Sequence, residues 1–318
     1  MSMPRPLHPH RAIACSALAL LALACTGESG KATGNAPPAS AGERIVVMAP
    51  GAAETLAALG LADRVVGVGD FVTYPPALAA RPRLGAYDAP DVERLLGLGT
   101  TLYVTALSEA GAAARARLEA LGVEVLALDT ATYDGTLAGI ERLGERLGAR
   151  PGAEALTAGI RLRVEAVRRG AAALPRRRVL CAVGRDPLYA AGPGSHLDEL
   201  LRAAGGENVL ADAGAPYVLA SLEAVLARRP EVIVDLSDNR AGAPRGAVAG
   251  DWGRWPFLPA VVDARVYQVD PVRLAIPGPR LAEMAELLAR AIHPERFGAP
   301  RDEEMGSLAP AGTQAGGE

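Results

Sequence analysis

The chain contains two short passages of the same pattern, about 130 residues apart. Residues 92–104, VERLLGLGTTLYV, align without a gap with residues 222–234, LEAVLARRPEVIV. Each copy predicts a short helix with one glutamate near its start, then a turn, then a buried β-strand. A chain that repeats an αβ unit is predicted to form two similar lobes, and small ligands usually bind in the cleft between such lobes.

Strands and helices alternate outside the repeat as well. Apolar runs predict strands and the segments between them predict helices, in both halves of the chain. Strands are expected at 44–49, 64–68, 123–128, 179–183, 232–236 and 266–269, and helices at 53–59, 110–121 and 196–203. This order predicts an α/β fold of two Rossmann-like lobes, each a mostly parallel sheet covered by helices on both faces.

A long helix is predicted between the halves. Residues 152–173 contain no proline, and apolar residues recur there at helical spacing. A helix of about 22 residues is about 33 Å long, enough to join two lobes and to restrict them to a small twist or hinge. The predicted domains are an N-terminal lobe at 44–151, a connecting helix at 152–174 and a C-terminal lobe at 175–298.

The N-terminus predicts export. An apolar run at 12–24 follows two arginines, is too short to cross a bilayer as a mature helix, and ends in Ala22-Leu23-Ala24-Cys25. Small residues before a cysteine resemble the bacterial lipoprotein cleavage motif. We therefore expect residues 1–24 to be a lipoprotein signal peptide and Cys25 to carry lipid in the periplasm; secretion with soluble release is the alternative.

The two ends of the exported chain lack the apolar content to fold. Residues 25–43 are expected to be a flexible tether and residues 299–318 a disordered tail. Cys181 lies in an apolar strand and is expected to be a buried, inert thiol. The net charge of −3 argues against a nucleic-acid partner, because no basic field is present to neutralise phosphates.

Enzymatic function is not indicated. The exported part of the chain has only two histidines, His196 and His293, so a zinc site built from several histidines is disfavoured. Gly194-Ser195-His196 lacks the spacing of a nucleophile elbow, and Ser195 with Asp198 predicts a helix N-cap instead. No catalytic residue, metal site or resident cofactor is expected.

Several separate stretches resemble the helical-backbone substrate-binding proteins of ABC importers, which carry cobalamin, haem or iron-siderophore complexes. The matching stretches are 49–50 followed by 54–56, 66–68 leading to Tyr74-Pro75-Pro76, 203–209 (AAGGENV) and 277–280 (PGPR). The resemblance covers residues 44–297. It implies a monomeric extracytoplasmic receptor that hands its ligand to a permease dimer driven by a cytoplasmic ATPase.

Aromatic residues make up only 4% of the chain, yet four fall at positions that resemble the cleft aromatics of the cobalamin-binding members. These are Phe71, Tyr87, Tyr189 and Tyr217. All four are expected in loops that follow strands, where α/β folds place ligand sites. The resemblance implies a corrinoid ligand, because flat side chains cover a broad apolar ring at small entropic cost. Arg273 is a further candidate that reaches the cleft from the C-terminal lobe.

The residue types leave other ligands open. The cobalamin-binding members favour tryptophan at the positions of Tyr87 and Tyr217 and phenylalanine at that of Tyr189. Tyrosine can ligate ferric haem, so haem or a ferric siderophore remains an alternative, although the axial tyrosine of the haem-binding members falls on Ala86. A lipoprotein that senses or stores its ligand without a transporter is the third possibility.

The repeated glutamates, Glu93 and Glu223, need no function when each is taken alone, because a helix dipole favours an acidic first turn. Their equivalent placement changes this interpretation. In the family these positions resemble lobe-tip carboxylates that dock onto arginines of the two permease subunits, one anion for each identical pocket. Glu54, also early in a helix, is expected to have a capping or structural role, and Tyr74 to lie in a rigid turn.

Overall fold

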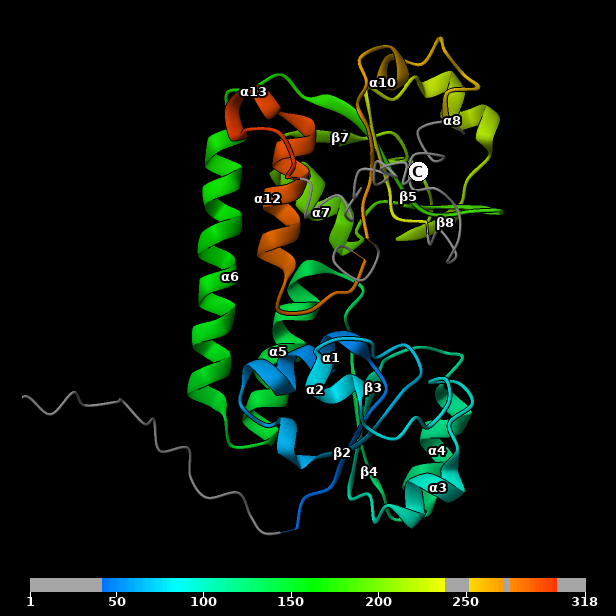
Figure 1. Cartoon of the computed structure of the whole chain (residues 1–318), viewed down its shortest axis with the longest axis vertical. Helices are drawn as coiled ribbons and strands as arrows, with labels where there is room; N and C mark the ends of the chain where they lie inside the picture. Colours follow the sequence, from blue (N-terminus) through cyan, green and yellow to red (C-terminus); the bar gives the residue numbers. More distant parts are fainter. Residues whose placement is uncertain (1–41, 238–251, 271–274, 302–318) are drawn as a thin grey trace, which may run out of the picture. The chain divides into compact units, whose positions relative to one another are not determined.

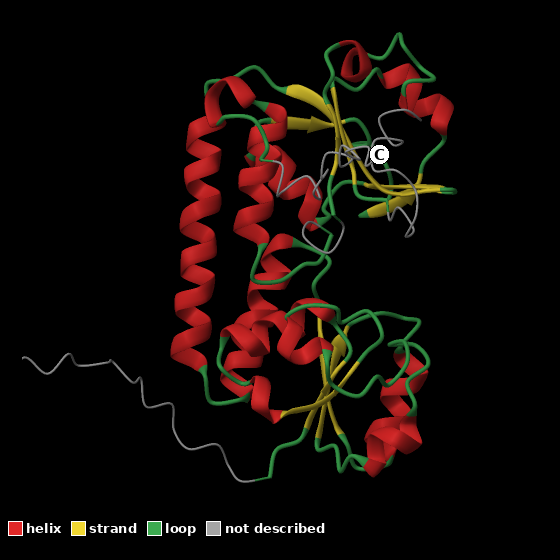
Figure 2. Ribbon diagram, in the orientation of Figure 1, coloured by secondary structure: helices red, strands yellow, loops and turns green. Residues whose placement is uncertain are grey.

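The computed structural model describes residues 42–237, 252–270 and 275–301. Two sheets, each with helices on both sides, form the two lobes of an α/β fold, as predicted (Figures 1 and 2). Cys25 and Arg273 lie outside the described residues. Within the described ranges, no helix is both long and apolar enough to span a membrane.

The sheet of the N-terminal lobe has four parallel strands in the order β2-β1-β3-β4. The strands are β1 (Ile45–Val47), β2 (Val65–Val68), β3 (Leu102–Ala106) and β4 (Glu124–Leu128). Its helices are α1 (Pro50–Ala58), η1 (Ala62–Arg64), α2 (Pro76–Ala79), α3 (Val92–Gly97) and α4 (Ala112–Ala120). Ile45 packs on the side of Leu56 in α1, whereas Val46 packs on the side of Leu95 in α3. Both faces are therefore buried, which accounts for the continuous apolar run of β1.

The C-terminal lobe repeats this arrangement and adds to it. Its sheet runs β10-β9-β5-β6-β8, with β7 paired to the start of β5. The strands are β5 (Arg177–Arg185), β6 (Leu188–Ala191), β7 (Gly206–Asn208), β8 (Tyr217–Leu219), β9 (Val232–Asp235) and β10 (Val266–Gln268). The parallel set β7-β5-β9-β10 corresponds to β2-β1-β3-β4, whereas the antiparallel strands β6 and β8 have no counterpart among the described strands of the first lobe. We call this pair the β6–β8 ribbon.

The described helices of the C-terminal lobe are α7 (His196–Ala203), α8 (Leu222–Arg228), α10 (Pro259–Val262), α12 (Leu281–Ile292) and α13 (Pro294–Phe297). The predicted repeat corresponds to α3-turn-β3 and α8-turn-β9. The side chains of Asp91 and Ser221 cap the two helices, each accepting a hydrogen bond from the main-chain N–H three residues further on. The aligned turn residues Gly99 and Arg229 both have left-handed backbones, with φ of 64° and 49°. The repeat is thus confirmed down to its caps and turns.

Two helices connect the lobes, α5 (Tyr133–Arg146) and α6 (Arg150–Ala171), and α6 packs against both α5 and α12 (Figure 1). Neither α5 nor α12 is predicted by the sequence patterns above. Within α5, Leu137 and Ile140 lie in the core of the C-terminal lobe, whereas Leu143 lies in the core of the N-terminal lobe. A single helix therefore contributes to both cores.

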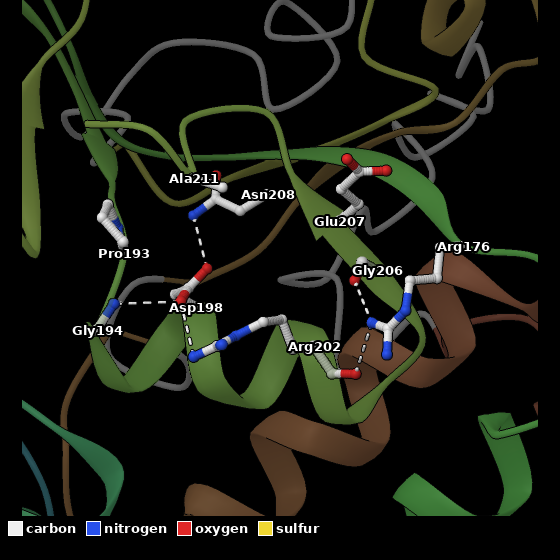
Figure 3. Close-up of a pocket in the computed structure, with 9 residues that line it drawn as sticks. All are labelled: Arg176, Pro193, Gly194, Asp198, Arg202, Gly206, Glu207, Asn208 and Ala211. Atoms are coloured by element: carbon white, nitrogen blue, oxygen red, sulfur yellow. Dashed lines mark hydrogen bonds and ion pairs between the residues drawn. The ribbon is translucent and has the colours of Figure 1, made fainter.

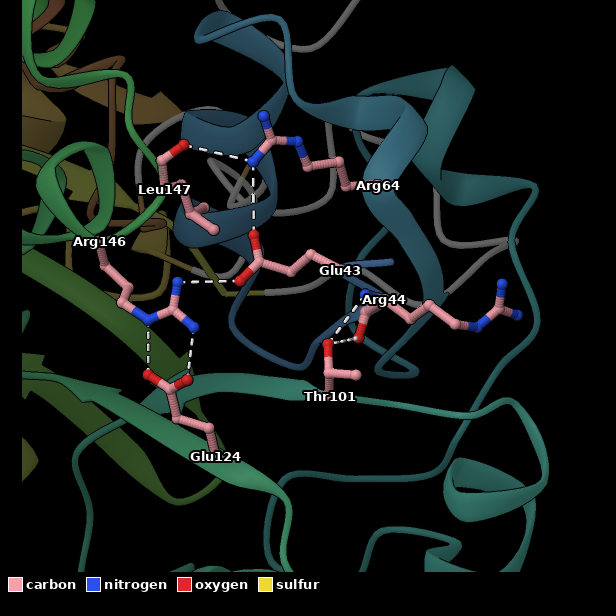
Figure 4. A network of polar contacts seen from close by, with 7 residues as sticks. All are labelled: Glu43, Arg44, Arg64, Thr101, Glu124, Arg146 and Leu147. Atoms are coloured by element: carbon pink, nitrogen blue, oxygen red, sulfur yellow. Dashed lines mark hydrogen bonds and ion pairs between the residues drawn. The ribbon is translucent and has the colours of Figure 1, made fainter. Parts of the chain in front are cut away.

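A network of polar side chains lies at the start of β1 in the N-terminal lobe (Figure 4). The carboxylate of Glu43 accepts hydrogen bonds from Arg146 at 2.9 Å and from Arg64 at 3.4 Å. Arg146 also pairs with Glu124 at the start of β4. The beginning of β1 is therefore tied to the neighbouring strands and to the end of α5.

A buried ion pair joins α1 of the first lobe to the residue before α12 of the second. The guanidinium of Arg280 donates two hydrogen bonds to the carboxylate of Glu54, with Nε–Oε2 at 2.7 Å and Nη2–Oε1 at 2.5 Å. The two side chains are 15% and 4% exposed. Burial raises the pKa of the Glu54 carboxyl, and Arg280 opposes that shift. The role of Glu54 is thus the structural one: it joins the lobes.

Two further contacts surround this pair. The guanidinium of Arg280 lies over the ring of Tyr74, 5.1 Å from its centroid, which gives this turn residue a structural partner. At Gly51 an added Cβ would fall 1.9 Å from the carbonyl oxygen of Pro277. Only glycine fits this contact between α1 and the 277–278 segment, so the lobes meet there through their backbones.

We predict that Glu54→Gln lowers the free energy of unfolding by roughly 3 kcal/mol, because a neutral amide then replaces the buried carboxylate to which Arg280 donates two hydrogen bonds. Urea denaturation measures the change. The control is Glu165→Gln, which breaks the exposed Arg168–Glu165 pair of α6 and should cost less than about 1 kcal/mol. Equal effects of the two variants would contradict a special role for the Glu54–Arg280 pair.

Candidate functional site

Three exposed apolar side chains lie at the carboxyl ends of strands in the N-terminal lobe. Phe71 follows β2, Leu107 follows β3 directly, and Tyr87 lies in the loop that leads to α3. In open α/β sheets, ligands bind outside the carboxyl ends of the strands. We call these three residues the N-lobe apolar surface. Leu107 was not among the predicted site residues, because in the sequence an exposed leucine after a strand cannot be told from a core leucine.

Hydrogen bonds hold the loops that carry this surface. The main-chain N–H of Asp70 donates to the carbonyl of Gly85 at 3.0 Å, and the N–H of Gly85 donates to the Asp70 carboxylate at 3.2 Å. The buried hydroxyl of Tyr103 donates to the carbonyl of Tyr87 at 3.5 Å, and burial raises the pKa of Tyr103 to about 12. The hydrogen bonds between Asp70 and Gly85 thus hold the loop of Phe71 beside the loop of Tyr87.

In the C-terminal lobe the candidate aromatics lie on strands, so the expectation that all four occupy loops is wrong. Tyr189 belongs to β6 and Tyr217 begins β8. In the ribbon Tyr189 pairs with Leu219 and Ala191 pairs with Tyr217. Side chains of paired residues, and of residues two apart, share one face of a sheet. Tyr189, Tyr217 and Leu219 therefore share a face, on which all three are exposed.

We call these three residues the C-lobe apolar surface. The other face of the ribbon is part of the core: Ala190 is fully buried there, and Leu188 and Val218 pack against the same cluster. The ribbon therefore has one face in the core, and its other face carries the three exposed apolar side chains beside the buried Ala191. Exposed apolar residues gathered in this way mark interaction sites more often than single ones do.

Tyr217 has a polar partner behind it. Its hydroxyl lies 3.1 Å from Nδ1 of His196, the first residue of α7. His196 is 2% exposed, and burial lowers its pKa to about 4, with a smaller opposing effect from the Ala131 carbonyl. Burial also raises the pKa of Tyr217. Both groups are therefore neutral at neutral pH.

A second polar network anchors the end of β6 (Figure 3). The carboxylate of Asp198 accepts hydrogen bonds from Asn208 at 3.0 Å and from the main-chain N–H of Gly194 at 3.2 Å. The Asn208 amide also donates to the carbonyl of Ala191 in β6. Ser195 caps α7 by accepting from the N–H of Asp198 at 3.1 Å, as predicted. The AAGGENV stretch thus supports the strand that carries Tyr189.

Three hollows on the C-terminal lobe lie away from the four candidate aromatic residues. The hollow of Figure 3 has a volume of about 280 Å³ and is lined by Asp198, Arg202 and Asn208 among others. A hollow of about 530 Å³ lies between α6 and α7, and one of about 290 Å³ lies beside Arg228. None of the three is lined by a residue of either apolar surface.

Glu93 and Glu223 are both exposed in the first turns of their helices, α3 and α8. The Glu223 carboxylate accepts a hydrogen bond from the Ser221 hydroxyl at 3.2 Å, and Ser221 also caps the helix. Each lobe therefore presents one carboxylate at the same place in the same unit.

Neither a metal centre nor a reactive thiol is found in the parts of the chain that the structure covers. Across 42–237, 252–270 and 275–301, no group of three or more histidine, cysteine, aspartate or glutamate residues could hold a metal ion. Cys181 is buried, and burial raises the pKa of its thiol to about 12. The prediction of an inert thiol is confirmed.

Comparison with known proteins identifies the family. A family model described as periplasmic binding protein matches residues 45–270. The chain belongs to the periplasmic binding protein family. Family members are extracytoplasmic solute-binding components of ABC transporters, which act with a permease and an ATPase and are not enzymes.

Three similar members of the periplasmic binding protein family illustrate its range. An uncharacterised ABC transporter substrate-binding lipoprotein of Bacillus subtilis, YvrC, is 30% identical over 80% of this chain and 81% of its own length. A cobalamin-binding protein of Halobacterium salinarum is 32% identical over 79% of this chain and 69% of its own length. Among solved structures, the haem-binding protein RhuT from Roseiflexus is 29% identical in sequence, and the match covers 79% of this chain and 98% of RhuT with a TM-score of 0.69.

We predict that acid destabilises the protein through His196. Because its pKa falls from 6.5 to about 4 on folding, the unfolded chain binds a proton between these pH values that the folded chain does not. The free energy of unfolding therefore decreases as the pH falls from 6.5 to 4, by at most roughly 3 kcal/mol from this residue. Urea denaturation at several pH values should show a shallower decrease for His196→Asn; identical slopes would contradict the assignment.

Proposed function

We propose that this protein captures a corrinoid between the N-lobe and C-lobe apolar surfaces and delivers it to the permease of an ABC importer. The observation that carries the proposal is the pair of exposed apolar surfaces, one at the carboxyl edge of the first sheet and one on the β6–β8 ribbon. A corrin ring is broad and largely apolar, and flat side chains such as Phe71 and Tyr189 suit it.

The cobalamin-binding name of the Halobacterium relative supports this ligand, whereas the haem-binding name of the Roseiflexus protein supports haem as the rival. Ala86 stands where the resemblance places the axial tyrosine of haem-binding members, and alanine cannot ligate iron. Tyr189 and Tyr217 of the C-terminal lobe lie on the paired strands β6 and β8. This favours stacking on a flat ligand.

Isothermal calorimetry with cobalamin, haemin and a ferric siderophore, each added separately to the purified protein, tests the ligand. We expect cobalamin to bind and the other two to bind more weakly. Tight haemin binding without a cobalamin signal would overturn the proposed ligand while leaving the transporter class unchanged.

We predict that Leu219→Ala weakens cobalamin binding about fivefold, because it removes apolar area beside Tyr189. Leu162→Ala is the matched control: Leu162 is 67% exposed on α6, as Leu219 is 63% exposed on β8. Calorimetry should show an unchanged dissociation constant for the control. If both variants bind like the wild type, Leu219 does not contact the ligand.

The paired glutamates, Glu93 and Glu223, are proposed to dock onto the permease. Helix dipoles explain an acidic first turn, but not one exposed carboxylate per lobe at equivalent positions of a repeat. A twofold transporter presents the same basic pocket twice and needs one anion from each lobe. Lipidation of Cys25, outside the described residues, would keep the protein near that transporter and stays a prediction.

We predict that Glu93→Arg combined with Glu223→Arg abolishes cobalamin uptake by cells and leaves the dissociation constant for cobalamin unchanged. Repulsion between the new arginines and the basic pockets is the physical reason. Glu119→Arg, on the exposed surface of α4, is the control and should transport normally. Normal uptake by the double variant would favour a sensing or storage protein that needs no transporter.

A further inference from the structure

The contact between Tyr217 and His196 determines which part of Tyr217 a ligand can meet. Tyr217 is 36% exposed, yet its hydroxyl lies 3.1 Å from a histidine that is only 2% exposed. The hydroxyl end of the side chain is therefore the inner end. What Tyr217 exposes is the ring.

His196 is itself held in place. As the first residue of α7, it follows the cap residue Ser195, and its main-chain N–H donates to the carbonyl of Ala131 at 3.0 Å. Ala131 lies between β4 and α5, on the segment that enters the second lobe. The imidazole thus sits on a helix start fixed from two sides, as a supporting residue of a binding site requires.

We propose that His196 is a positioning residue of the ligand site, which engages the hydroxyl of Tyr217 and so presents the ring face of that tyrosine to the ligand. This inference rests on the proposed function, because it takes Tyr217 as a ligand contact. It also specifies the part of the ligand that contacts Tyr217: a flat, largely apolar surface that stacks on the phenol ring.

His196 is unfavourable for folding in one respect, which a role in positioning Tyr217 would explain. Its Nε2 atom is buried without a hydrogen-bond partner among the described residues. A buried polar atom left in this state opposes folding, whereas an apolar side chain of similar size would avoid the cost. The imidazole makes a hydrogen bond and a tilted ring contact, at 6.2 Å between centroids, with Tyr217, and the Ala131 carbonyl has a smaller effect on it.

The charge states support a stacking role for Tyr217 over a metal-binding one. Burial opposes the imidazolium form of His196 and the phenolate form of Tyr217 at the same time. Proton transfer between them is therefore unfavourable, and the pair remains a neutral hydrogen bond. A neutral phenol whose oxygen faces inward is poorly suited to ligate ferric iron.

The test compares His196→Leu with His196→Asn, which have similar shapes and differ in hydrogen-bonding ability. The side chain of asparagine places a donor and an acceptor near the position of Nδ1, so it can bond to Tyr217 whichever partner donates. Calorimetry with cobalamin should show affinity about fivefold weaker for His196→Leu and within about twofold of wild type for His196→Asn, since one hydrogen bond is lost only in the first.

A double-mutant cycle with Tyr217→Phe separates positioning from general damage to the fold. Tyr217→Phe keeps the ring, removes the hydroxyl and should weaken cobalamin binding as much as His196→Leu does. Combining the two should cost no more than either alone, because they remove the same hydrogen bond. Additive losses would overturn the inference, since His196 would then act through something other than Tyr217.

Tyr217→Ala distinguishes failure of the inference from failure of the proposed function. If Tyr217→Ala loses affinity while His196→Leu binds like the wild type, His196 does not position Tyr217 and the proposed ligand surface stands. If Tyr217→Ala binds cobalamin, haemin and the ferric siderophore as the wild type does, both the inference and the proposed C-lobe apolar surface are wrong.

Discussion

The packing of α5, α6 and α12 is the constraint on which the rest of the structure depends. The two sheets have separate cores, but Leu137 and Leu143 of the single helix α5 belong to different ones. A lobe cannot lose its core without uncovering part of the other, so we expect the two lobes to unfold together. This differs from two domains on a linker, whose relative motion is the default expectation.

The ion pair between Glu54 and Arg280 adds a second connection to this helical layer. It brings two charges out of water, which is rarely a net source of stability but makes any other arrangement of the lobes costly. The backbone contact at Gly51 has the same effect, because it leaves no space for a side chain. Together these features favour a receptor that moves little when it binds.

Local patterns predicted the parts of the fold that local forces determine. The strands, the long helix and the repeat follow from periodicity, since β3 and β9 begin at the aligned residues Leu102 and Val232. Helix α12 was missed although Glu283, Glu286 and Arg290 recur at helical spacing along one side of an otherwise buried segment. The short strands β6 and β8 gave no alternation long enough to recognise.

The candidate site was predicted only in part, for a related reason. Resemblance selected Tyr189 and Tyr217, but their shared face depends on antiparallel register, which joins residues about 30 positions apart. The Glu54–Arg280 pair spans 226 positions, and no spacing rule connects such residues. His196 and Leu219 were likewise invisible as site residues, because their roles depend on which neighbour the fold brings to them.

The two-faced ribbon has a consequence for how the protein can evolve. Ala190 of β6 belongs to the core, whereas Tyr189 and Leu219 on the other face point outward. Mutations at these two outward positions can accumulate without disturbing the core, and the parallel strands that carry the lobes need not change with them. A lineage could therefore adopt a new cargo in a few substitutions and still use the transporter that it already has.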